Sequence, residues 1–516
     1  MAKKIVIDPI TRIEGHLKIE TEINNNVVTS AKASADMFRG IESALTGYDA
    51  RVAQQVTQRV CGVCPYAHAE AAAKALEDAM GIRPNRNGQL LRNLIMGAYQ
   101  LQDHILHFYQ LCALDFIDVA AVLKYGGKDK DLNYVKDWIT TEQKSTKIYP
   151  LAPFFPRYKA DYCRDQEVNI SAIKHYCESL PMMSDLHKMV AIFGGKSPHT
   201  VTIEAGGVTT TPTVLSIAKY RTYLHQAEDF IKNKYTPDIV AVAKIFKNYF
   251  KEGKGYGSLL SYSQYPDSNG DNSLFTGGTT IKGKHLKLDL DKIYEDHTYA
   301  YYKNDSKMQA RPLTREQPVP LDWQEFEKHH KDSKGKYSWS KAPRYNGYAM
   351  EVGPVARLVN TYLNKSNVLV NRMVDKFNRE LGITIKDYAS VMGRHLSRAI
   401  IANVLIEKLK NDIENVEADV NAFVEHDIPK NARGVGLIEA SRGALGHWIR
   451  TDKDGYISRY DMIVPTTWNI SPRNSKRNPG PVEKMLIGTR VKDAKNPIEL
   501  ARIVRSTDPC IACSVH

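Results

Sequence analysis

Two cysteine pairs of the form Cys-x-x-Cys constrain this chain more than any other feature. Cys61 and Cys64 lie near the start of the 516-residue sequence, and Cys510 and Cys513 lie close to its end. Together the pairs supply four thiolates, a complete tetrahedral set for a soft or borderline metal. Structural zinc modules usually place their pairs within about 15–20 residues of each other. Pairing across almost the whole chain instead predicts a fold whose two ends meet at a buried functional metal.

Two other interpretations of the paired cysteines stay open at this point. The four thiolates could hold a structural zinc ion, or the side chains could be ordinary residues of the hydrophobic core. The other three of the seven cysteines, Cys112, Cys163 and Cys177, lack such spacing and are expected to be core residues. Seven cysteines in a chain of this length are too few for a disulfide scaffold.

The composition is that of an ordinary globular protein with a sizeable core. Hydrophobic residues make up 42% of the chain and charged residues 25%, and the formal net charge is +13. The basic residues are dispersed and form no nucleic-acid-binding motif, so we expect a solvated surface and no nucleic acid partner. No apolar run reaches the roughly 18 residues of a membrane span, and the N-terminus does not resemble a signal peptide.

The periodicity of apolar residues predicts an α+β fold that is mainly α. A helical-bundle core would carry antiparallel strands at its periphery, and the two cysteine motifs would meet at its centre. Pro65 suits the start of a helix that ends at Gly81, which would place Cys64 at its N-terminus, where the helix dipole favours a thiolate. A second helix is expected over residues 88–112, whereas 125–165 appears irregular and charged.

We expect one large domain over residues 1–516, without internal repeats or low-complexity linkers. The expected regions are 1–50, an N-terminal β-hairpin region; 51–252, a helical core; 253–348, a strand-and-loop insertion; and 349–516, a helical core with the C-terminal metal-binding tail.

Further motifs accompany the cysteine pairs in a fixed order. They are Asp8–His16, Phe38–Glu42, Arg59–His68, Met350–Pro354, Glu439–Trp448, Val464–Asn469 and Asp508–His516. This ordered set resembles the signatures of the nickel–iron hydrogenase large subunit, and the length and motif style resemble its respiratory uptake group. A respiratory-complex quinone-binding subunit shares that fold but lacks the paired cysteines, which argues against it.

The resemblance implies a nickel ion bound by all four paired cysteines, with Cys64 and Cys513 also bridging to an iron. That iron would carry carbon monoxide and two cyanides, and Thr466 and the backbone near Pro465 would hold the cyanides. Cys510 stands where selenium-containing relatives have selenocysteine, so this chain resembles the all-cysteine form. Nickel with sulfur ligands can change oxidation state, which zinc cannot do.

The implied activity is the reversible heterolytic cleavage of dihydrogen, which needs a metal and a nearby base. By motif position, Arg442 would lie above the open metal face, with Asp103 and Asp508 orienting it and balancing its charge. A neutral guanidine is chemically demanding, so the Cys510 thiolate is an equally serious base. Glu14 would pass the proton outward.

Two further roles follow from the resemblance. His68, one helical turn after Cys64, would donate a hydrogen bond to a bridging cysteine sulfur. His516 would join Glu42 and the backbone carbonyl of Met462 at a magnesium-like site, where the identity of the cation stays open. In the family a maturation endopeptidase cuts after this histidine, so a chain that ends there is expected to be the processed form.

The chain departs from the family pattern at Ser441. The family usually has proline immediately before the active-site arginine, and the serine adds a hydroxyl beside the diatomic ligands. The resemblance therefore leaves the hydrogen bonding of those ligands open at this position.

The sequence holds no further cysteine cluster, so electrons must leave through another chain. The resemblance implies an iron–sulfur small subunit packed near Glu14–His16 and Arg59–His68, in a heterodimer or a dimer of heterodimers. It also implies a membrane cytochrome or quinone-linked acceptor and a place on the periplasmic side, after export with the small subunit. A cytoplasmic cofactor-reducing hydrogenase is the alternative.

Overall fold

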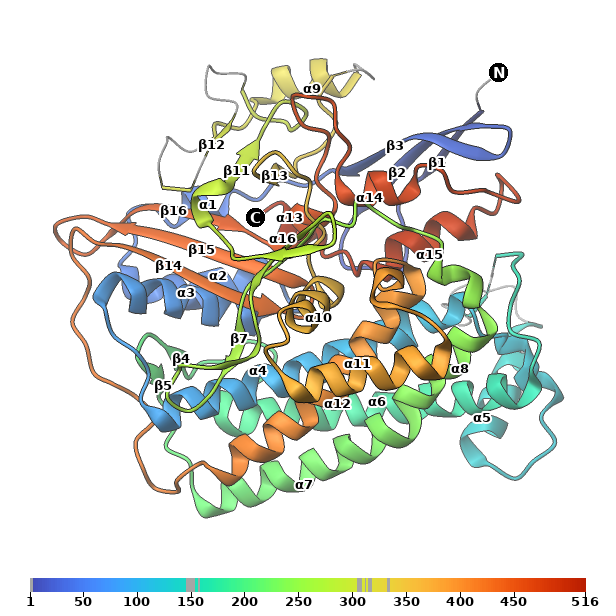
Figure 1. Cartoon of the computed structure of the whole chain (residues 1–516), viewed down its shortest axis with the longest axis horizontal. Coiled ribbons are helices and arrows are strands. Elements are labelled where there is room, and N and C mark those ends of the chain that lie inside the picture. Colours follow the sequence, from blue (N-terminus) through green and yellow to red (C-terminus); the bar gives the residue numbers. More distant parts are fainter. Residues whose placement is uncertain are drawn as a thin grey trace.

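Long helices pack side by side across one half of the molecule (Figure 1). The computed structural model describes residues 3–144, 154–155, 158–303, 309–310, 312–313, 318–331 and 335–516. The principal helices are α4 (Arg86–Leu106), α6 (Gln166–Gly194), α7 (Val214–Phe230), α8 (Thr236–Ile245), α10 (Pro354–Leu363), α11 (Val368–Leu381) and α12 (Val391–Glu414). This bundle confirms the predicted mainly helical core.

Helix α4 is the central rod of the bundle and confirms the helix predicted over 88–112. The Asn85 side chain accepts a hydrogen bond from the Gly88 N–H, which caps its first turn. Gly97 lets α12 approach closely, because a Cβ at this position would lie 2.4 Å from Leu409 Cδ2. A π-helical turn, His107–Cys112, follows α4 directly and completes the predicted span.

Three sheets carry most of the strands around the bundle. The N-terminal sheet contains β1 (Lys3–Ile7), β2 (Leu17–Asn24) and β3 (Val27–Ala35) in antiparallel order, as the alternating pattern of Leu17, Ile19 and Ile23 predicts. A second antiparallel sheet contains β14 (Arg433–Ala440), β15 (Gly443–Thr451) and β16 (Ile457–Ile463). The third is formed by β11 (Ile293–Asp296), β12 (Gln309–Ala310) and β13 (Ala342–Tyr345).

Helix α3 (Pro65–Met80) lies against β14 and brings the first cysteine pair beside the β14–β15 turn (Figure 1). The approach depends on two glycines of β14. A Cβ on Gly434 or Gly436 would lie 1.9 Å from the carbonyl oxygen of Ala75 or Ala71, respectively. Helix α3 starts at Pro65 and is capped by Gly81 in the left-handed conformation, as predicted.

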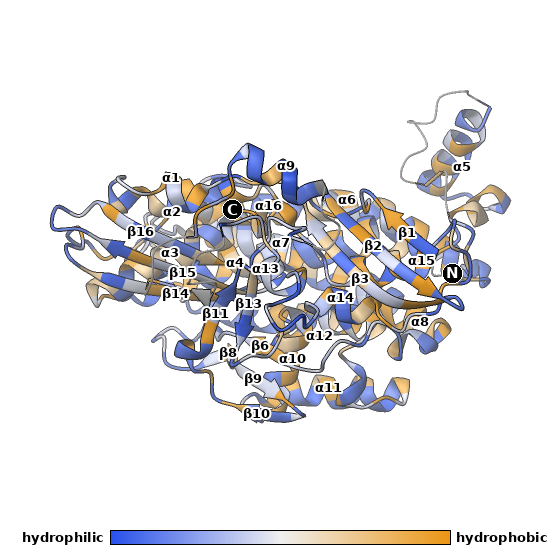
Figure 2. Ribbon diagram, turned by 90° about the horizontal axis from the view of Figure 1, so that it is seen from above, coloured by the Kyte–Doolittle hydropathy of each residue, from blue (hydrophilic) through white to orange (hydrophobic). Residues whose placement is uncertain are grey.

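Two helices form where the sequence pattern indicated loops or strands. Helix α5 (Lys130–Glu142) falls in the stretch 125–165 that appeared irregular, and it projects from the body of the molecule (Figure 2). The Asp129 carboxylate caps its first turn, and Leu132, Val135 and Ile139 form a narrow buried face. Helix α9 (Trp323–Lys331) interrupts the expected strand-and-loop region. Parts of both stretches lie outside the described residues.

The remaining elements are short. The strands are β4 (Ile203–Glu204), β5 (Gly207–Val208), β6 (Leu259–Ser261), β7 (Gln264–Pro266), β8 (Ser273–Phe275), β9 (Gly278–Ile281) and β10 (Lys284–Leu286). The helices are α1 (Ile41–Ala44), α2 (Ala53–Thr57), α13 (Pro465–Asn469), α14 (Pro481–Leu486), α15 (Ile498–Ser506) and α16 (Ile511–Ser514). Within the described part of the chain, no helix combines the length and apolarity needed to cross a membrane.

The segment that follows β1 meets the C-terminal tail. Glu14 and Cys510 form an isolated parallel bridge, in which the Ile511 N–H donates to the Glu14 carbonyl. The adjoining turn at Gly15 has φ +81°, and a Cβ there would lie 2.8 Å from Ile511 Cβ. This meeting confirms the predicted α+β fold with both cysteine motifs at one buried site. The proposed division of the chain into regions stays a prediction.

Candidate metal centre

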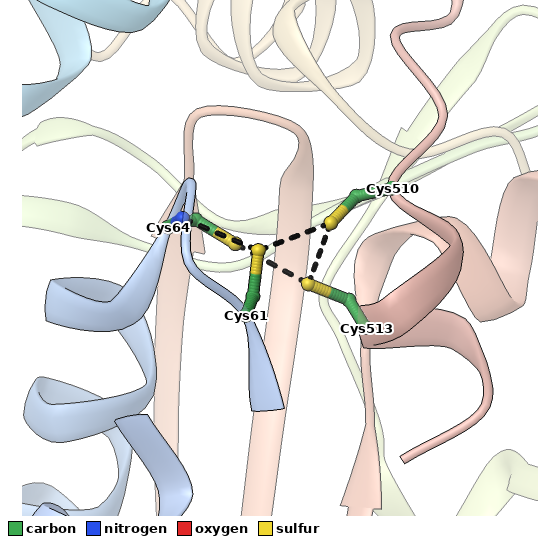
Figure 3. Close-up of side chains that lie close together, drawn as sticks. All are labelled: Cys61, Cys64, Cys510 and Cys513. Carbon is green, nitrogen blue, oxygen red and sulfur yellow. Dashed lines mark hydrogen bonds between the residues drawn. The ribbon is translucent and has the colours of Figure 1, made fainter. Parts of the chain in front are cut away.

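The four paired cysteines converge on one point (Figure 3). The Sγ atoms of Cys61 and Cys510 are 3.2 Å apart, those of Cys64 and Cys513 3.3 Å, and those of Cys510 and Cys513 2.9 Å. All four side chains are buried and free of disulfides. The structure therefore brings together the cysteine set that the sequence predicted.

Local backbone geometry aims each sulfur at this point. Cys61 is extended, and the N–H groups of Val63 and Cys64 point at its sulfur from 3.2 and 3.4 Å. Cys64 stands at the N-cap of α3, immediately before Pro65. In the tail, the Cys510 N–H donates to Thr466 Oγ1 at 3.1 Å, which fixes the turn that enters α16.

The chemistry of this donor set fits a metal ion with thiolate ligands. Hydrogen bonds from neighbouring thiols lower the pKa of Cys61, whereas burial raises the pKa of Cys510 and Cys513. One thiolate is thus stable among three thiols, but four buried thiolates would repel one another strongly. A soft or borderline cation removes that repulsion and fits the four sulfur donors.

Arg442 stands at the β14–β15 turn, close enough to the cysteine cluster for its charge to lower the pKa of Cys61. Its guanidinium donates to the Asp508 carbonyl and to Asp508 Oδ1, both at 3.1 Å, and its Nη1 lies 3.8 Å from Asp103 Oδ2. Arg442 Nη1 and Asp103 Oδ1 are buried and make no hydrogen bond with the described residues. These two unsatisfied atoms suit an additional group beside the sulfurs.

Arg442 is held in its charged form. Burial would lower its pKa, but Asp508 and Asp103 raise it well above the usual value for arginine. A guanidinium that keeps its proton can donate hydrogen bonds and polarise a neighbouring group, but it is a poor base. The choice between the two bases that the sequence left open, Arg442 and the Cys510 thiolate, stays a prediction.

Glu14 contacts the cysteine cluster directly. Its Oε2 accepts hydrogen bonds from Cys510 Sγ at 3.2 Å and from the Ala512 N–H at 2.9 Å. The side chain is only partly buried, so it joins the buried sulfur to the outer part of the protein. This contact is consistent with the predicted role of Glu14 in carrying protons.

The segment that bears Glu14 is anchored by a buried ion cluster. Arg505 donates to both oxygens of Asp115 and to the Thr11 carbonyl, and Arg12 also binds Asp115. The cluster ties the N-terminal segment to α15, whose Arg505 stands five residues before Cys510. These ion pairs fix the backbone of the segment that holds Glu14 next to Cys510.

His68 lies on the buried face of α3, as its spacing from Cys64 indicated. Its Nδ1 lies 3.2 Å from His447 Nε2, and His447 Nδ1 lies 2.7 Å from Tyr460 Oη. Burial lowers the pKa of His68 to about 4, so the ring is neutral at ordinary pH. The sequence did not single out this chain of rings, and the predicted bond from His68 to a cysteine sulfur stays a prediction.

The C-terminal histidine is buried beside Glu42. His516 Nε2 lies 3.3 Å from Glu42 Oε1, which also accepts the Met462 N–H at 2.6 Å. Lys341 Nζ lies 3.0 Å from Glu42 Oε2 and 3.2 Å from Glu295 Oε2. Sequence reasoning missed these two charged residues, because both lie in the region 253–348, which contains none of the motifs. The predicted roles of the Met462 carbonyl and of a divalent cation stay predictions.

A second group of possible metal ligands, His107, Cys112 and His395, lies next to α4. His107 Nε2 already lies 2.8 Å from the Arg505 carbonyl. Burial, together with the charge of Arg398, lowers the pKa of both histidines. A positive neighbour that disfavours a proton also disfavours a metal cation. The four-cysteine cluster is therefore the stronger metal site.

Comparison with known proteins identifies the family that carries this arrangement. The sequence model described as nickel-dependent hydrogenase matches residues 39–516, and one described as HoxL-like matches residues 4–34.

Full-length relatives agree with the family match. The periplasmic [NiFeSe] hydrogenase large subunit of Desulfomicrobium baculatum is 34% identical, over 99% of this chain and 95% of its own length. The quinone-reactive Ni/Fe-hydrogenase large chain of Wolinella succinogenes is 33% identical, over 100% of this chain and 96% of its own length. The structure of the Ni-Fe-Se hydrogenase from D. vulgaris Hildenborough superposes with a TM-score of 0.85, 34% identity and full coverage of both chains.

Proposed function

Because this chain belongs to the nickel-dependent hydrogenase family, whose members are oxidoreductases acting on dihydrogen, we propose that it is the catalytic large subunit of a nickel–iron hydrogenase. The observation that carries this proposal is the buried cluster of four cysteines, with Glu14 hydrogen-bonded to Cys510 and Arg442 held nearby by Asp508. When bound, the nickel–iron pair supplies the position at which dihydrogen is polarised and split. A closed structural zinc site would give neither residue a function.

The protein side chains would supply charge and proton handling. Arg442 keeps its charge, and its unsatisfied Nη1 would donate to the substrate and polarise it. Asp508 holds the guanidinium through two hydrogen bonds, and Asp103 balances its charge from the opposite side. Arg442 thus stays in one orientation throughout the reaction.

The proton would leave through Cys510 and Glu14. Cys510 Sγ is the sulfur within hydrogen-bond distance of a carboxylate, at 3.2 Å from Glu14 Oε2. A thiol that has taken a proton from the substrate can donate it to this carboxylate without a rearrangement of the backbone. Because Glu14 is only partly buried, it is the first group on that route with access to the outer part of the protein.

The ligand environment would complete the centre. Thr466 and Pro465, at the start of the buried helix α13, would hold iron-bound cyanides beside one carbon monoxide. His516, Glu42 and the Met462 carbonyl would hold Mg²⁺ or another divalent cation, with Lys341 and Glu295 as charged neighbours. Burial would raise the pKa of Glu42, but Lys341 and His516 lower it strongly, so this side chain is a charged carboxylate.

Electrons would pass to an iron–sulfur small subunit, because the seven cysteines of this chain include no further cluster motif. The relatives named as large subunits support such a partner. One relative is named periplasmic and another quinone-reactive, which supports respiratory hydrogen uptake on the periplasmic side, linked to a membrane cytochrome or quinone. The maturation endopeptidase and the cytoplasmic alternative rest on the sequence resemblance alone.

The proposal is tested by the turnover of dihydrogen in the purified, metal-loaded complex. The wild-type complex is expected to reduce an artificial electron acceptor with dihydrogen, whereas Glu14→Gln should lose about 10²–10⁴-fold in rate with its nickel content intact. The loss follows because the amide cannot take up the proton held by Cys510. Glu20→Gln, which changes a carboxylate on the distant strand β2, is the matched control.

Two results would contradict this account. A nickel-loaded wild-type complex without dihydrogen turnover would refute the proposed function. Full activity in Glu14→Gln would refute only the proton route.

A further inference from the structure

A buried hydroxyl pair lies next to Asp103, outside every role assigned above. Tyr66 Oη donates to Asp103 Oδ2 at 3.2 Å and lies 2.6 Å from Ser441 Oγ. All three side chains are buried. They come from three separate elements, namely α3, α4 and the β14–β15 turn. Because Ser441 directly precedes Arg442, the pair links the first cysteine motif to the arginine that faces the metal centre.

The direction of the two hydrogen bonds follows from the number of protons. A tyrosine hydroxyl has one proton, and the geometry assigns it to the Asp103 carboxylate. Ser441 must then donate its own proton to Tyr66 Oη. The two bonds point the same way, from Ser441 through Tyr66 to Asp103, and such chains strengthen one another. The hydroxyl pair therefore favours the charged form of Asp103.

The Tyr66 ring has little freedom to leave this position. It stacks on Tyr99, with ring centroids 3.8 Å apart and an interplanar angle of 21°. Tyr66 also stands at the second position of α3, immediately after the proline that follows Cys64. The stacked ring and the helix start hold the hydroxyl in a fixed direction.

We propose that Tyr66 and Ser441 form a positioning pair that keeps Asp103 as a carboxylate beside Arg442. The proposal rests on the function proposed above and adds two residues to it. Without the pair, Asp103 Oδ2 would retain only the 3.8 Å contact with Arg442, and Oδ1 has no partner among the described residues. A buried carboxylate with so few donors takes up a proton readily, and a neutral Asp103 no longer balances the charge of Arg442.

The groups around Asp103 have opposing effects on its pKa. Burial raises the pKa of Asp103 to about 7, the charge of Arg442 lowers it, and the charges of Asp508 and Cys61 raise it further. The charged and titratable groups that act on Asp103 or feel its charge come from several elements: Tyr66 from α3, Tyr99 from its own helix, Tyr265 from β7, Arg442 from the β14–β15 turn, Asp508 from the tail, and Cys61. The resulting pKa of Asp103 lies near neutral pH, so the loss of one hydroxyl donor should shift this pKa measurably.

The test measures the protonation of Asp103 in the metal-loaded complex. Infrared difference spectra between acidic and alkaline pH report it. The carbonyl band of protonated Asp103 is the band that Asp103→Asn removes. Tyr66→Phe is expected to move its midpoint upward by about one pH unit, since a hydrogen bond to the carboxylate favours the charged form. Ser441→Ala is expected to move it in the same direction.

Tyr99→Phe is the matched control, because it removes a buried tyrosine hydroxyl whose proton goes to the Pro198 carbonyl instead. The apparent pKa of the acid limb in the pH profile of dihydrogen oxidation should change in the same way. It should move upward in Tyr66→Phe and stay unchanged in Tyr99→Phe. Equal nickel content in all variants confirms that the centre is loaded.

The proposal is overturned if the Asp103 midpoint stays unchanged in both Tyr66→Phe and Ser441→Ala, or if Tyr99→Phe shifts it as much as Tyr66→Phe. A wild-type complex with no dihydrogen turnover would instead refute the proposed function. The two failures are therefore distinguishable.

Discussion

Replacement of Cys61 by serine is expected to abolish nickel binding and dihydrogen turnover together. Cys61 is the cysteine whose pKa is lowered, because neighbouring thiols donate hydrogen bonds to its sulfur and two backbone N–H groups also point at it. It is thus the thiolate around which the other three can be assembled. A serine hydroxyl stays protonated at ordinary pH and is a hard donor, so the soft ligand set is broken.

The measurement is nickel per protein in the purified complex, together with the rate of dihydrogen oxidation. Cys163→Ser is the matched control, because Cys163 is also buried and free but its thiol donates to the backbone carbonyl of Asp165, two residues away. The control should retain nickel and activity. Normal nickel in Cys61→Ser would show that Cys61 is not a metal ligand.

Replacement of Arg442 by lysine is expected to leave nickel bound and to reduce turnover by about 10²–10³-fold, the usual effect of removing one preorganised donor. The guanidinium donates to both the carbonyl and the carboxylate of Asp508, while its buried Nη1 has no hydrogen-bond partner among the described residues. A lysine ammonium is a single point charge and cannot make both contacts and face the substrate. The metal ligands are untouched by this change.

Arg459→Lys provides the comparison for the arginine change. Arg459 is a buried arginine that pairs with Asp461 on β16 and has no contact with the cysteine cluster. Its replacement should cost stability without a selective loss of turnover. Full activity in Arg442→Lys would remove Arg442 from the mechanism.

The sequence predicted the metal centre better than its surroundings. The four cysteines, Glu14 and Arg442 belong to ordered motifs, and the structure brings them together because the chain ends meet at the Glu14–Cys510 bridge. The alternating β2 pattern and the Pro65 and Gly81 signals also specified their elements correctly. These features depend on local spacing, which a sequence displays directly.

The missed features depend on contacts between distant segments. Lys341, from a region without motifs, contacts both Glu42 and Glu295. Tyr66 contacts Ser441, which is 375 positions away in the sequence. Nothing in a single sequence indicates which buried tyrosine hydroxyl will meet a carboxylate. Helix α5 was missed because its apolar face is only three buried residues wide in a charged segment.

The infrared spectrum of the purified, nickel-loaded protein tests the central claim most directly. Metal-bound carbon monoxide and cyanide absorb in a window where amino acids do not. A nickel–iron centre predicts one carbon monoxide band and two cyanide bands, all of which should vanish in Cys61→Ser. The absence of these bands in nickel-loaded wild-type protein would contradict the nickel–iron assignment. The four cysteines would then bind a metal without carbon monoxide or cyanide ligands.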